Sequence, residues 1–283
     1  MALASFVRWC GVALWASAFT GCHLSSVVFA PEPEAQSVPA AGEERPNEPP
    51  IEMLFPDEPV LRVVTGSVSC TGTLIYENQV LTAHHCVSER DAAGRVVHRD
   101  VDPEQVIVEL GGDYLPWAEV GVRAVVAPDC GYAAGHGDIA ILVLDTKLVR
   151  AKTAVPRLDS TPEVGEQVRP VGFGRCDTNG IRRRQRSGGA IEVVDADRFK
   201  LNAAICPGDS GGPALSVERG DVVGIISASI MDNGEGELRR SEFTRLDQWR
   251  PVFAAAKMIA DGAESAEVPP VDCPALHGPS QTR

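Results

Sequence analysis

One stretch of the sequence decides how the rest is interpreted: Cys206-Pro207-Gly208-Asp209-Ser210-Gly211-Gly212-Pro213. It surrounds one serine with three glycines, which lack the Cβ that would block close approach of the backbone and which tolerate backbone angles closed to other residues. The pattern predicts a tight loop whose N–H groups point toward whatever the serine hydroxyl attacks. A glycine-rich surface turn is the plainer interpretation of so short a motif.

The same residues also fit G-x-S-x-G, the nucleophile turn of α/β-hydrolases, in which the acid and then the histidine follow the serine. Here the only histidine after Ser210 is His277, in a tail that contains Pro and Gly. Better partners precede the serine, in the stretches T-A-H-H-C at 82–86 and G-D-I-A-I-L at 137–142. The order along the chain is therefore His, Asp, Ser, which argues against an α/β-hydrolase.

In this order the motifs resemble those of the trypsin/chymotrypsin-like serine proteases, T-A-A-H-C, D-I-A-L-L and G-D-S-G-G-P, over about residues 60–262. The resemblance implies an all-β fold, in which two six-stranded antiparallel β-barrels pack together with a C-terminal helix. Short apolar runs broken by Gly, Asn and Asp are also typical of such folds. The runs are 60–64, 73–75, 79–82, 106–110, 119–126, 139–144, 167–172, 191–194, 213–216 and 221–230, and the helix candidate is 247–260.

The resemblance also implies a catalytic triad. A serine hydroxyl is a weak nucleophile and needs a base within hydrogen-bond reach. By motif position Ser210 is the nucleophile, His85 is the general base, and Asp138 orients the imidazole and stabilises its charged form. The backbone N–H groups of Gly208 and Ser210 would form the oxyanion hole. His84, which stands where the family has alanine, is the alternative base.

One part of the family pattern is missing. In the family, the aspartate at Asp209 pairs with a new N-terminal amine that zymogen cleavage releases. No I-V-G-G precedes Cys70 at the expected distance, and Arg45-Pro46 is a poor cleavage site. Either another donor holds Asp209, or an unrecognised protease cuts the chain. Candidate donors are arginines that we expect nearby, for which a solvated surface loop is the plainer interpretation: Arg182, Arg183, Arg184 and Arg186.

The expected substrate pocket also departs from that of trypsin. Its floor in the family is the residue six before the nucleophile, here Ala204, where an aspartate would select Arg or Lys. Ser229 and Ser241 would stand on its walls if Ser227, Ala228 and Ser229 align with the usual S-W-G. Ser227 is then also expected to belong to the pocket. We therefore expect a preference for small or medium apolar P1 residues. Selectivity would be loose, because one methylene is worth only about 1–3 kcal/mol in such a pocket.

The eight cysteines divide into groups. Cys10 would be removed with an export signal and Cys22 would be lipidated. The resemblance assigns a disulfide between Cys70 and Cys86, on either side of the histidine loop. Three pairings remain open for the other four, which are Cys130, Cys176, Cys206 and Cys273. The chain has no C-x-x-C spacing, so we expect no zinc site. The resemblance implies a reaction that needs no metal or other cofactor.

The N-terminal region has the pattern of an export signal over residues 1–21, with Arg8 followed by an apolar run too short to span a bilayer as a helix, which needs about 20 residues. The sequence F-T-G-C, which ends at Cys22, resembles a bacterial lipobox, in which the cysteine becomes the lipidated first residue. Plain secretion and a buried N-terminal helix are the alternatives. Residues 22–59, acidic and rich in proline, predict a disordered tether, and residues 263–283 a C-terminal tail.

The formal net charge of −13 argues against a nucleic-acid partner. We expect a monomeric serine endopeptidase that acts on peptides or proteins, exported by a bacterium and lipid-anchored in the cell envelope, at the outer membrane or in the periplasm, or secreted. Disulfides agree with export. The alternative is a catalytically impaired homologue that binds peptide or protein at the envelope. An esterase is a weak third possibility, because simple esters are only side substrates for such a triad.

Overall fold

The computed structural model describes residues 59–111, 116–130, 136–175, 183–229 and 241–273. Cys22 and the expected signal and tether lie outside these residues, as do Cys176, Arg182 and His277. All of the described residues belong to the compact unit that spans Pro49–Arg283. Among them, no helix is both long enough and apolar enough to cross a bilayer.

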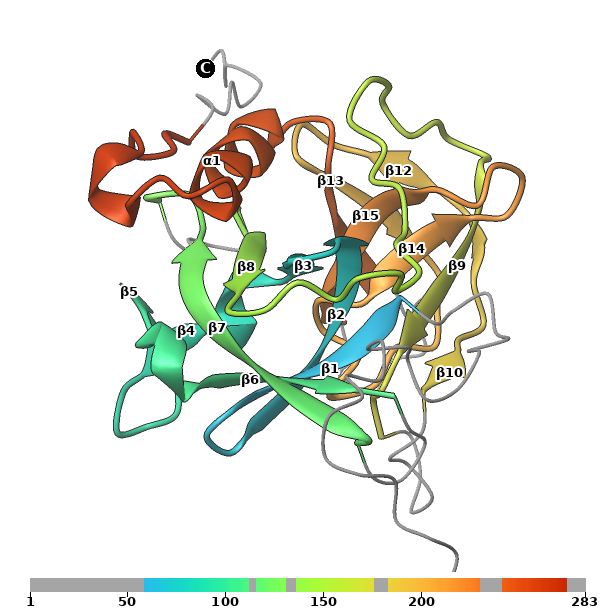
Figure 1. The fold of residues 1–283 in the computed structure, drawn as a ribbon. Helices are drawn as coiled ribbons and strands as arrows, with labels where there is room; N and C mark the ends of the chain where they lie inside the picture. The colour runs from blue at the N-terminus through green and yellow to red at the C-terminus, as the bar shows by residue number, and fades with distance from the viewer. Residues whose placement is uncertain (1–58, 112–115, 131–135, 176–182, 230–240, 274–283) are drawn as a thin grey trace, which may run out of the picture. The chain divides into compact units, whose positions relative to one another are not determined.

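The first half of the described chain forms a closed antiparallel barrel (Figure 1). Its strand order is β1-β2-β3-β8-β7-β6. The strands are β1 (Val60–Thr65), β2 (Val68–Tyr76), β3 (Gln79–Thr82), β6 (Val106–Leu110), β7 (Ala118–Val126) and β8 (Ala140–Leu144). A short hairpin of β4 (Ser88–Arg90) and β5 (Val96–Asp100) lies outside this barrel.

The second half forms an eight-stranded sheet in the order β10-β9-β14-β15-β16-β13-β12, with β11 also paired to β9. Its strands are β9 (Gln167–Gly172), β10 (Arg184–Gln185), β11 (Gly189–Ala190), β12 (Val193–Val194), β13 (Arg198–Leu201), β14 (Pro213–Ser216), β15 (Val222–Ser229) and β16 (Ser241–Arg245). The all-β class, the first closed six-stranded barrel and the C-terminal helix confirm the expected fold, whereas the described strands of the second half form an eight-stranded sheet where a second six-stranded barrel was expected. The sequence had not indicated the short strands β10 and β13, nor β16.

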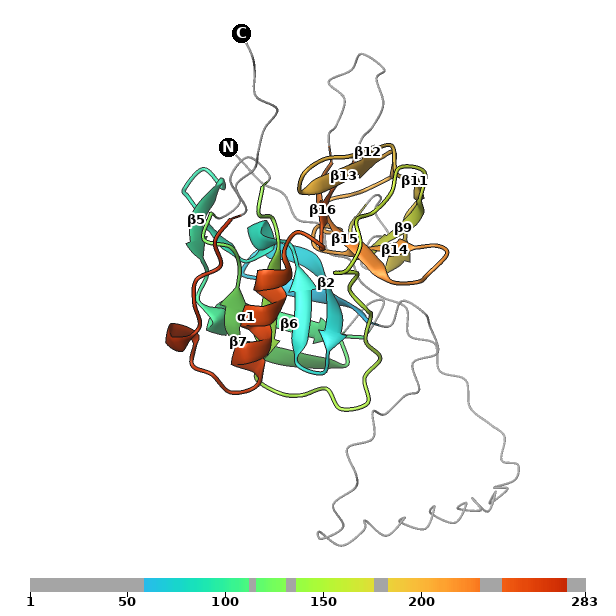
Figure 2. The ribbon, with the colours of Figure 1, turned by 90° about the horizontal axis from the view of Figure 1, so that it is seen from above.

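One α-helix, α1 (Arg250–Ala260), follows the last strand and packs beside β7 and β8 of the barrel (Figures 1 and 2). Pro251 lies in its first turn, where a missing N–H costs nothing. All five residues of β8 are buried, since one face of this strand points into the barrel and the other is covered by the helix. Three 3-10 turns complete the regular structure of the described residues: His84–Cys86, Pro103–Gln105 and Ser265–Glu267.

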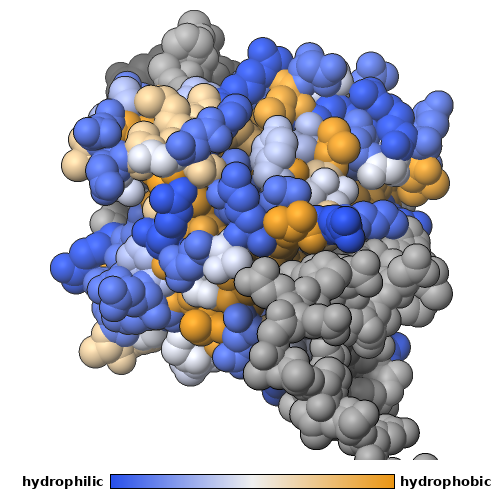
Figure 3. All heavy atoms as spheres, viewed as in Figure 1, coloured by the Kyte–Doolittle hydropathy of each residue, from blue (hydrophilic) through white to orange (hydrophobic). Residues whose placement is uncertain are grey.

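Apolar side chains form two buried clusters. The larger fills the barrel and the space beneath α1, and the smaller lies in the second sheet around Phe199 and Phe243, whose rings stack with centroids 5.0 Å apart. On the face seen in Figure 3, hydrophobic residues are interspersed with hydrophilic ones.

Two disulfides brace the first half of the described chain and its C-terminal end. The structure joins Cys70 to Cys86, as the resemblance implies, and Cys130 to Cys273. The second bridge answers a pairing that the sequence left open, and it ties the segment after α1 back to the barrel, where Asp129 N–H also donates to the Val271 carbonyl. Cys206 is disulfide-bonded too.

Candidate active site

The glycine-rich stretch forms a tight loop directly before β14. Gly208 and Gly211 have φ angles of +100° and +81°, which residues other than glycine rarely adopt. A Cβ on Gly211 would lie 2.2 Å from Thr82 Oγ1 and 2.3 Å from the Thr71 carbonyl oxygen. The loop that carries Ser210 is therefore pressed against the first barrel, at the end of the strand that leads to the histidines.

Thr71, the residue after Cys70 on β2, holds this loop in place. Its hydroxyl donates to the Gly208 carbonyl at 2.7 Å and accepts from the Phe173 N–H at 3.0 Å, while its own N–H donates to the Ser210 carbonyl at 2.8 Å. Thr71 is fully buried. Sequence reasoning missed this residue, because threonine is common in strands and nothing else marks it.

His85 and Asp138 lie together, as the motif positions predict. The His85 Nδ1 lies 2.9 Å from Asp138 Oδ2, and the His85 backbone N–H donates to Asp138 Oδ1 at 3.0 Å. His85 sits in the 3-10 turn after β3, and Asp138 lies just before β8, which pairs with β3. The pairing of these two strands therefore brings the imidazole and the carboxylate together.

Asp138 is completely buried and receives a further hydrogen bond from across the interface between the barrel and the second sheet. The Ser227 hydroxyl on β15 donates to Asp138 Oδ2. Thr244 on β16 donates its hydroxyl to the Asp138 carbonyl at 3.0 Å. The second sheet thus supports the acid that orients the imidazole of the first barrel, which leaves this carboxylate well compensated for its loss of water.

The two side chains shift each other's pKa. Burial lowers the pKa of His85, but the charge and hydrogen bond of Asp138 outweigh it, so this pKa lies above the ordinary 6.5. Burial raises the pKa of Asp138, but the His85 charge and hydrogen bonds from His85 and Ser227 outweigh it, so this pKa lies below the ordinary 3.8. Asp138 is therefore ionised at neutral pH, and it favours the charged imidazolium that forms when His85 takes a proton.

The Cys70–Cys86 bridge lies between the serine loop and the histidine. Cys86 Sγ is 3.7 Å from the Ser210 carbonyl oxygen, and one ring nitrogen of His85 lies within 4.8 Å of both sulfur atoms. This group has the residue types of a metal site. Because the two sulfurs are bonded to each other, however, neither is a thiolate that could bind a metal ion.

His84, the alternative base, occupies a different environment. It is buried, and its Nε2 lies 2.5 Å from Asp100 Oδ1 in the neighbouring β5. Asp138 therefore orients His85 alone, while His84 fixes the turn to the hairpin that follows it.

The predicted oxyanion-hole amides differ from their neighbours in hydrogen bonding. The neighbouring Asp209 and Gly211 N–H groups donate to carbonyls of Cys206 and Ile226. Within the described residues, by contrast, the amides of Gly208 and Ser210 donate to no acceptor. Two such N–H groups beside one serine hydroxyl are what an oxyanion hole requires.

The predicted pocket residues fall into two groups. Ala204 is exposed, whereas Ser241 is buried and donates its hydroxyl to the Ala203 carbonyl at 3.0 Å. Ser227, predicted as a residue of the pocket, donates its hydroxyl to Asp138 Oδ2 and so supports the catalytic acid. Ser229 lies on β15 opposite Ser241, and its side chain lies outside the described parts.

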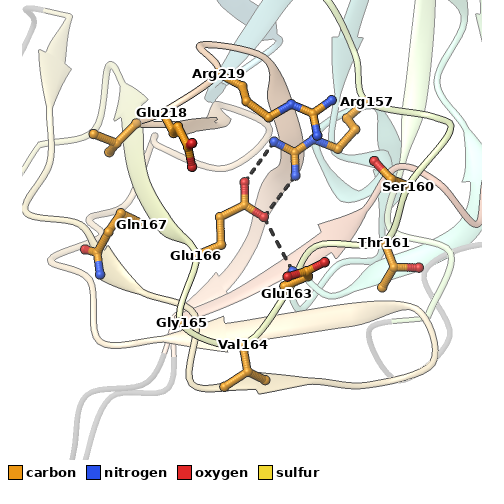
Figure 4. A pocket seen from close by; sticks show the side chains of 11 residues that line it. Arg157, Ser160, Thr161, Glu163, Val164, Gly165, Glu166, Gln167, Glu218 and Arg219 are labelled. Carbon is orange, nitrogen blue, oxygen red and sulfur yellow. Dashed lines mark hydrogen bonds and ion pairs between the residues drawn. The ribbon is translucent and has the colours of Figure 1, made fainter.

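A cavity of about 620 Å³ lies elsewhere and contains none of the residues predicted for catalysis (Figure 4). On its wall, the buried Arg157 reaches Glu166 and also pairs with Asp221 at 2.6 Å. With both acids on one guanidinium, this cluster has the character of a structural ion-pair network.

Comparisons with known proteins identify the family. The family model described as Trypsin matches residues 59–252, so the chain belongs to the trypsin family of serine proteases. Among curated proteins it is similar to the cercarial protease of Schistosoma mansoni, 27% identical over 59% of this chain and 73% of that one. It is also similar to the peroxisomal leader peptide-processing protease of Mus musculus, 31% identical over 62% of this chain but only 28% of that longer protein.

Solved structures share the fold. A structure of Glu endopeptidase in complex with MPD has a TM-score of 0.59 and 20% identity, over 72% of this chain and 92% of that one. Neuropsin, a serine protease of mouse brain, has a TM-score of 0.54 and 20% identity, over 72% of this chain and 95% of that one. At such identities the likeness shows a shared fold and does not extend to the substrates of these enzymes.

Proposed function

We propose that this protein is a serine endopeptidase that hydrolyses peptide bonds through an acyl-enzyme on Ser210. The observation that carries the proposal is the buried Asp138, which binds both Nδ1 and the backbone N–H of His85. With Nδ1 held in this way, proton transfer falls to Nε2. The family, the fold and the unengaged amides of Gly208 and Ser210 support the same conclusion.

In the proposed reaction, Ser210 Oγ attacks the carbonyl carbon of the scissile bond as its proton passes to His85 Nε2. The N–H groups of Gly208 and Ser210 stabilise the negative oxygen of the tetrahedral intermediate. The C–N bond then breaks, and the leaving amine takes the proton from His85. Water next attacks the acyl-enzyme by the same steps, which releases the acid and restores Ser210.

For the substrate, we propose small or medium apolar side chains at P1. Ala204 offers only a methyl group at an exposed position, and the nearby Ser241 hydroxyl is engaged by the Ala203 carbonyl. Neither group offers a charge that would select a charged P1 residue. A scan of peptide substrates that differ only at P1 tests this, and a strong preference for Arg or Lys would contradict it.

The non-catalytic alternative rests in part on the missing activation sequence, which would leave Asp209 without the amine that the family uses as its partner. Asp209 has a partner within the domain: Arg186 Nη2 lies 2.8 Å from its Oδ1. This observation favours the enzyme. The test is labelling with a fluorophosphonate, which reacts with an activated serine, beside a Ser210→Ala control. Rapid labelling of the wild type that the control lacks is the expected result, and equal labelling of both would contradict it.

We also propose export, with lipid attachment at Cys22. The disulfides Cys70–Cys86 and Cys130–Cys273 support an oxidising compartment, since cytosolic thiols are kept reduced. Metabolic labelling with a palmitate analogue in a bacterial host tests the attachment. A Cys22→Ser variant should lose the label, and a label that persists in this variant would contradict the proposal.

A further inference from the structure

Asp209, the residue before Ser210, is an acid completely withdrawn from water. Its Oδ1 accepts a hydrogen bond from the Gly174 N–H at 2.7 Å, and its Oδ2 accepts one from the Cys206 N–H at 2.9 Å. Taking a carboxylate out of water costs several kcal/mol unless a cation also compensates it. The two backbone donors offset part of this cost, and a cation beside the carboxylate offsets more of it.

Arg186 supplies that charge from within the domain. Its Nη2 lies 2.8 Å from Asp209 Oδ1, and the side chain is only 6% exposed. The same nitrogen donates to the Gly174 carbonyl, and the Arg186 backbone N–H donates to the Pro170 carbonyl at 2.8 Å. Arg186 directly follows β10, which pairs with β9. The pairing of these two strands therefore places the Arg186 guanidinium beside the Asp209 carboxylate.

The surroundings of Asp209 are shaped for its side chain. A Cβ on Gly172 would lie 2.3 Å from Asp209 Oδ1, and a Cβ on Gly174 would lie 2.5 Å from its Cγ. Only glycine leaves room at these two positions. The Asp209 carboxylate is thus bonded to Gly174, Cys206 and Arg186. These bonds restrain the backbone that leads directly into Ser210.

We infer that Arg186 is a positioning residue that holds Asp209, and through it the Gly208 and Ser210 amides, in the arrangement needed for catalysis, so that the protease needs no cleavage at its N-terminus to become active. This inference rests on the proposed function. The resemblance assigns the same task to an N-terminal amine released by cleavage. Here the Arg186 guanidinium already pairs with the Asp209 carboxylate, and both residues belong to the folded domain.

The two kinds of cation differ in their response to alkali. An α-amino group loses its proton near pH 8, whereas guanidinium groups stay charged at any pH at which proteins fold. An enzyme that depends on an amine partner loses its oxyanion hole as the pH rises through that range. The arginine arrangement predicts that the labelling rate of Ser210 does not fall between pH 8 and pH 10.

The first experiment compares the chain that begins at Cys22, its start verified by mass spectrometry, with the same chain cleaved by limited proteolysis ahead of residue 59. Fluorophosphonate labelling rates within about twofold of each other are expected. Labelling that appears only after cleavage would overturn the inference while leaving the proposed function in place. No labelling in either form would overturn both.

The second experiment compares Arg186→Ala with Arg157→Ala. Both variants remove a buried arginine paired with acids in the second half of the domain, and Arg157 lies in the cavity of Figure 4 among residues with no role in catalysis. Per folded molecule, Arg186→Ala should label about 100-fold more slowly, the order of effect of losing one oxyanion-hole donor. Arg157→Ala should label at close to the wild-type rate.

Two further readouts separate positioning from general stability. About 20 mM guanidinium, compared with sodium chloride at the same ionic strength, should restore labelling to Arg186→Ala by filling the vacated site. Arg186→Lys, the variant that best keeps the fold, should label at neutral pH and lose labelling as the pH approaches about 10, where an ammonium group deprotonates. Wild-type labelling in Arg186→Ala, or an alkaline profile unchanged by Arg186→Lys, would overturn the inference.

Discussion

The Thr71 hydroxyl donates to the Gly208 carbonyl at 2.7 Å, which ties β2 of the first barrel to the loop that presents Ser210 from the second sheet. This bond fixes the peptide unit beside a predicted oxyanion-hole amide. Asp209 fixes the opposite side of the same loop through Arg186. Contacts from both halves of the domain thus hold the loop, and its geometry depends on how the two halves pack.

Thr71→Val should weaken both activity and stability. Valine keeps the shape but leaves the Gly208 carbonyl and the Phe173 N–H without their partner, at about 1–3 kcal/mol for each unsatisfied group. We expect at least a tenfold loss in kcat/KM and a lower melting temperature. Thr71→Ser, which keeps the hydroxyl, should recover most of the activity.

Thr73→Val is the matched control, because Thr73 is also fully buried on β2 and its hydroxyl has no partner within the described residues. Removing that hydroxyl should leave kcat/KM unchanged and stability equal or higher. If Thr73→Val reduced activity as much as Thr71→Val, the role given to the Thr71 hydroxyl would be wrong.

Activity should fall as the pH drops through the raised pKa of His85. His85 must be neutral to accept the Ser210 proton, and Asp138 holds its pKa above 6.5. The acid limb of kcat/KM, which reports the free enzyme, should therefore have its midpoint above pH 6.5. The lowered pKa of Asp138 keeps that group ionised throughout this range. A midpoint below pH 6 would contradict the assignment of His85.

Ser227→Ala should move that acid limb to higher pH. The Ser227 hydroxyl donates a hydrogen bond to the Asp138 carboxylate and partly neutralises its negative charge. Without this hydroxyl, Asp138 should stabilise the His85 imidazolium more strongly and raise the pKa of His85 further. The plateau of kcat/KM should also fall roughly fivefold, which corresponds to about one hydrogen bond. Ser216→Ala, which removes a buried hydroxyl bonded to the Arg219 N–H instead, should leave the acid limb in place.

Much of this site could be predicted because its chemistry lies in short motifs. His85, Asp138 and Ser210 follow from three stretches that are each local in sequence, and strands such as 79–82 and 106–110 follow from local apolar runs. The roles of Thr71 and Ser227 could not be predicted in this way. Their hydroxyls act on residues 137 and 89 positions away, and only the packing of the two halves brings them together.

Arg186 lies between residues that local motifs predict and residues that only packing reveals. The sequence identified four arginines as candidate partners for Asp209, with a solvated loop as the plainer interpretation. Choosing among them depends on the register of β10 against β9, in which a slip of one residue turns every side chain to the other face. Two-residue strands of exposed polar residues carry no pattern that would fix such a register.

Gly211→Ala should disrupt the serine loop far more than Gly220→Ala. Both glycines have a positive φ, of +81° and +73°, so both variants bear the backbone strain of about 1–2 kcal/mol. A Cβ at Gly220 would meet nothing within 4 Å, whereas one at Gly211 would strike Thr82 Oγ1 and the Thr71 carbonyl. Melting temperature and labelling rate should therefore drop sharply only in Gly211→Ala, and equal losses in both would refute the packing argument.

Ala204→Asp tests the floor of the substrate pocket. If Ala204 lies beneath the P1 side chain, a carboxylate there should attract a cationic P1 residue and repel apolar ones. The ratio of kcat/KM for Arg over Ala at P1 should rise about tenfold or more, since a close charge pair shielded from water is worth over 1 kcal/mol. Val217→Asp, at another exposed apolar position of the second sheet's surface, is the control for a general gain of negative charge. A similar change in both variants would mean that charge steers the substrate from a distance, and Ala204 would then lose its place in the pocket.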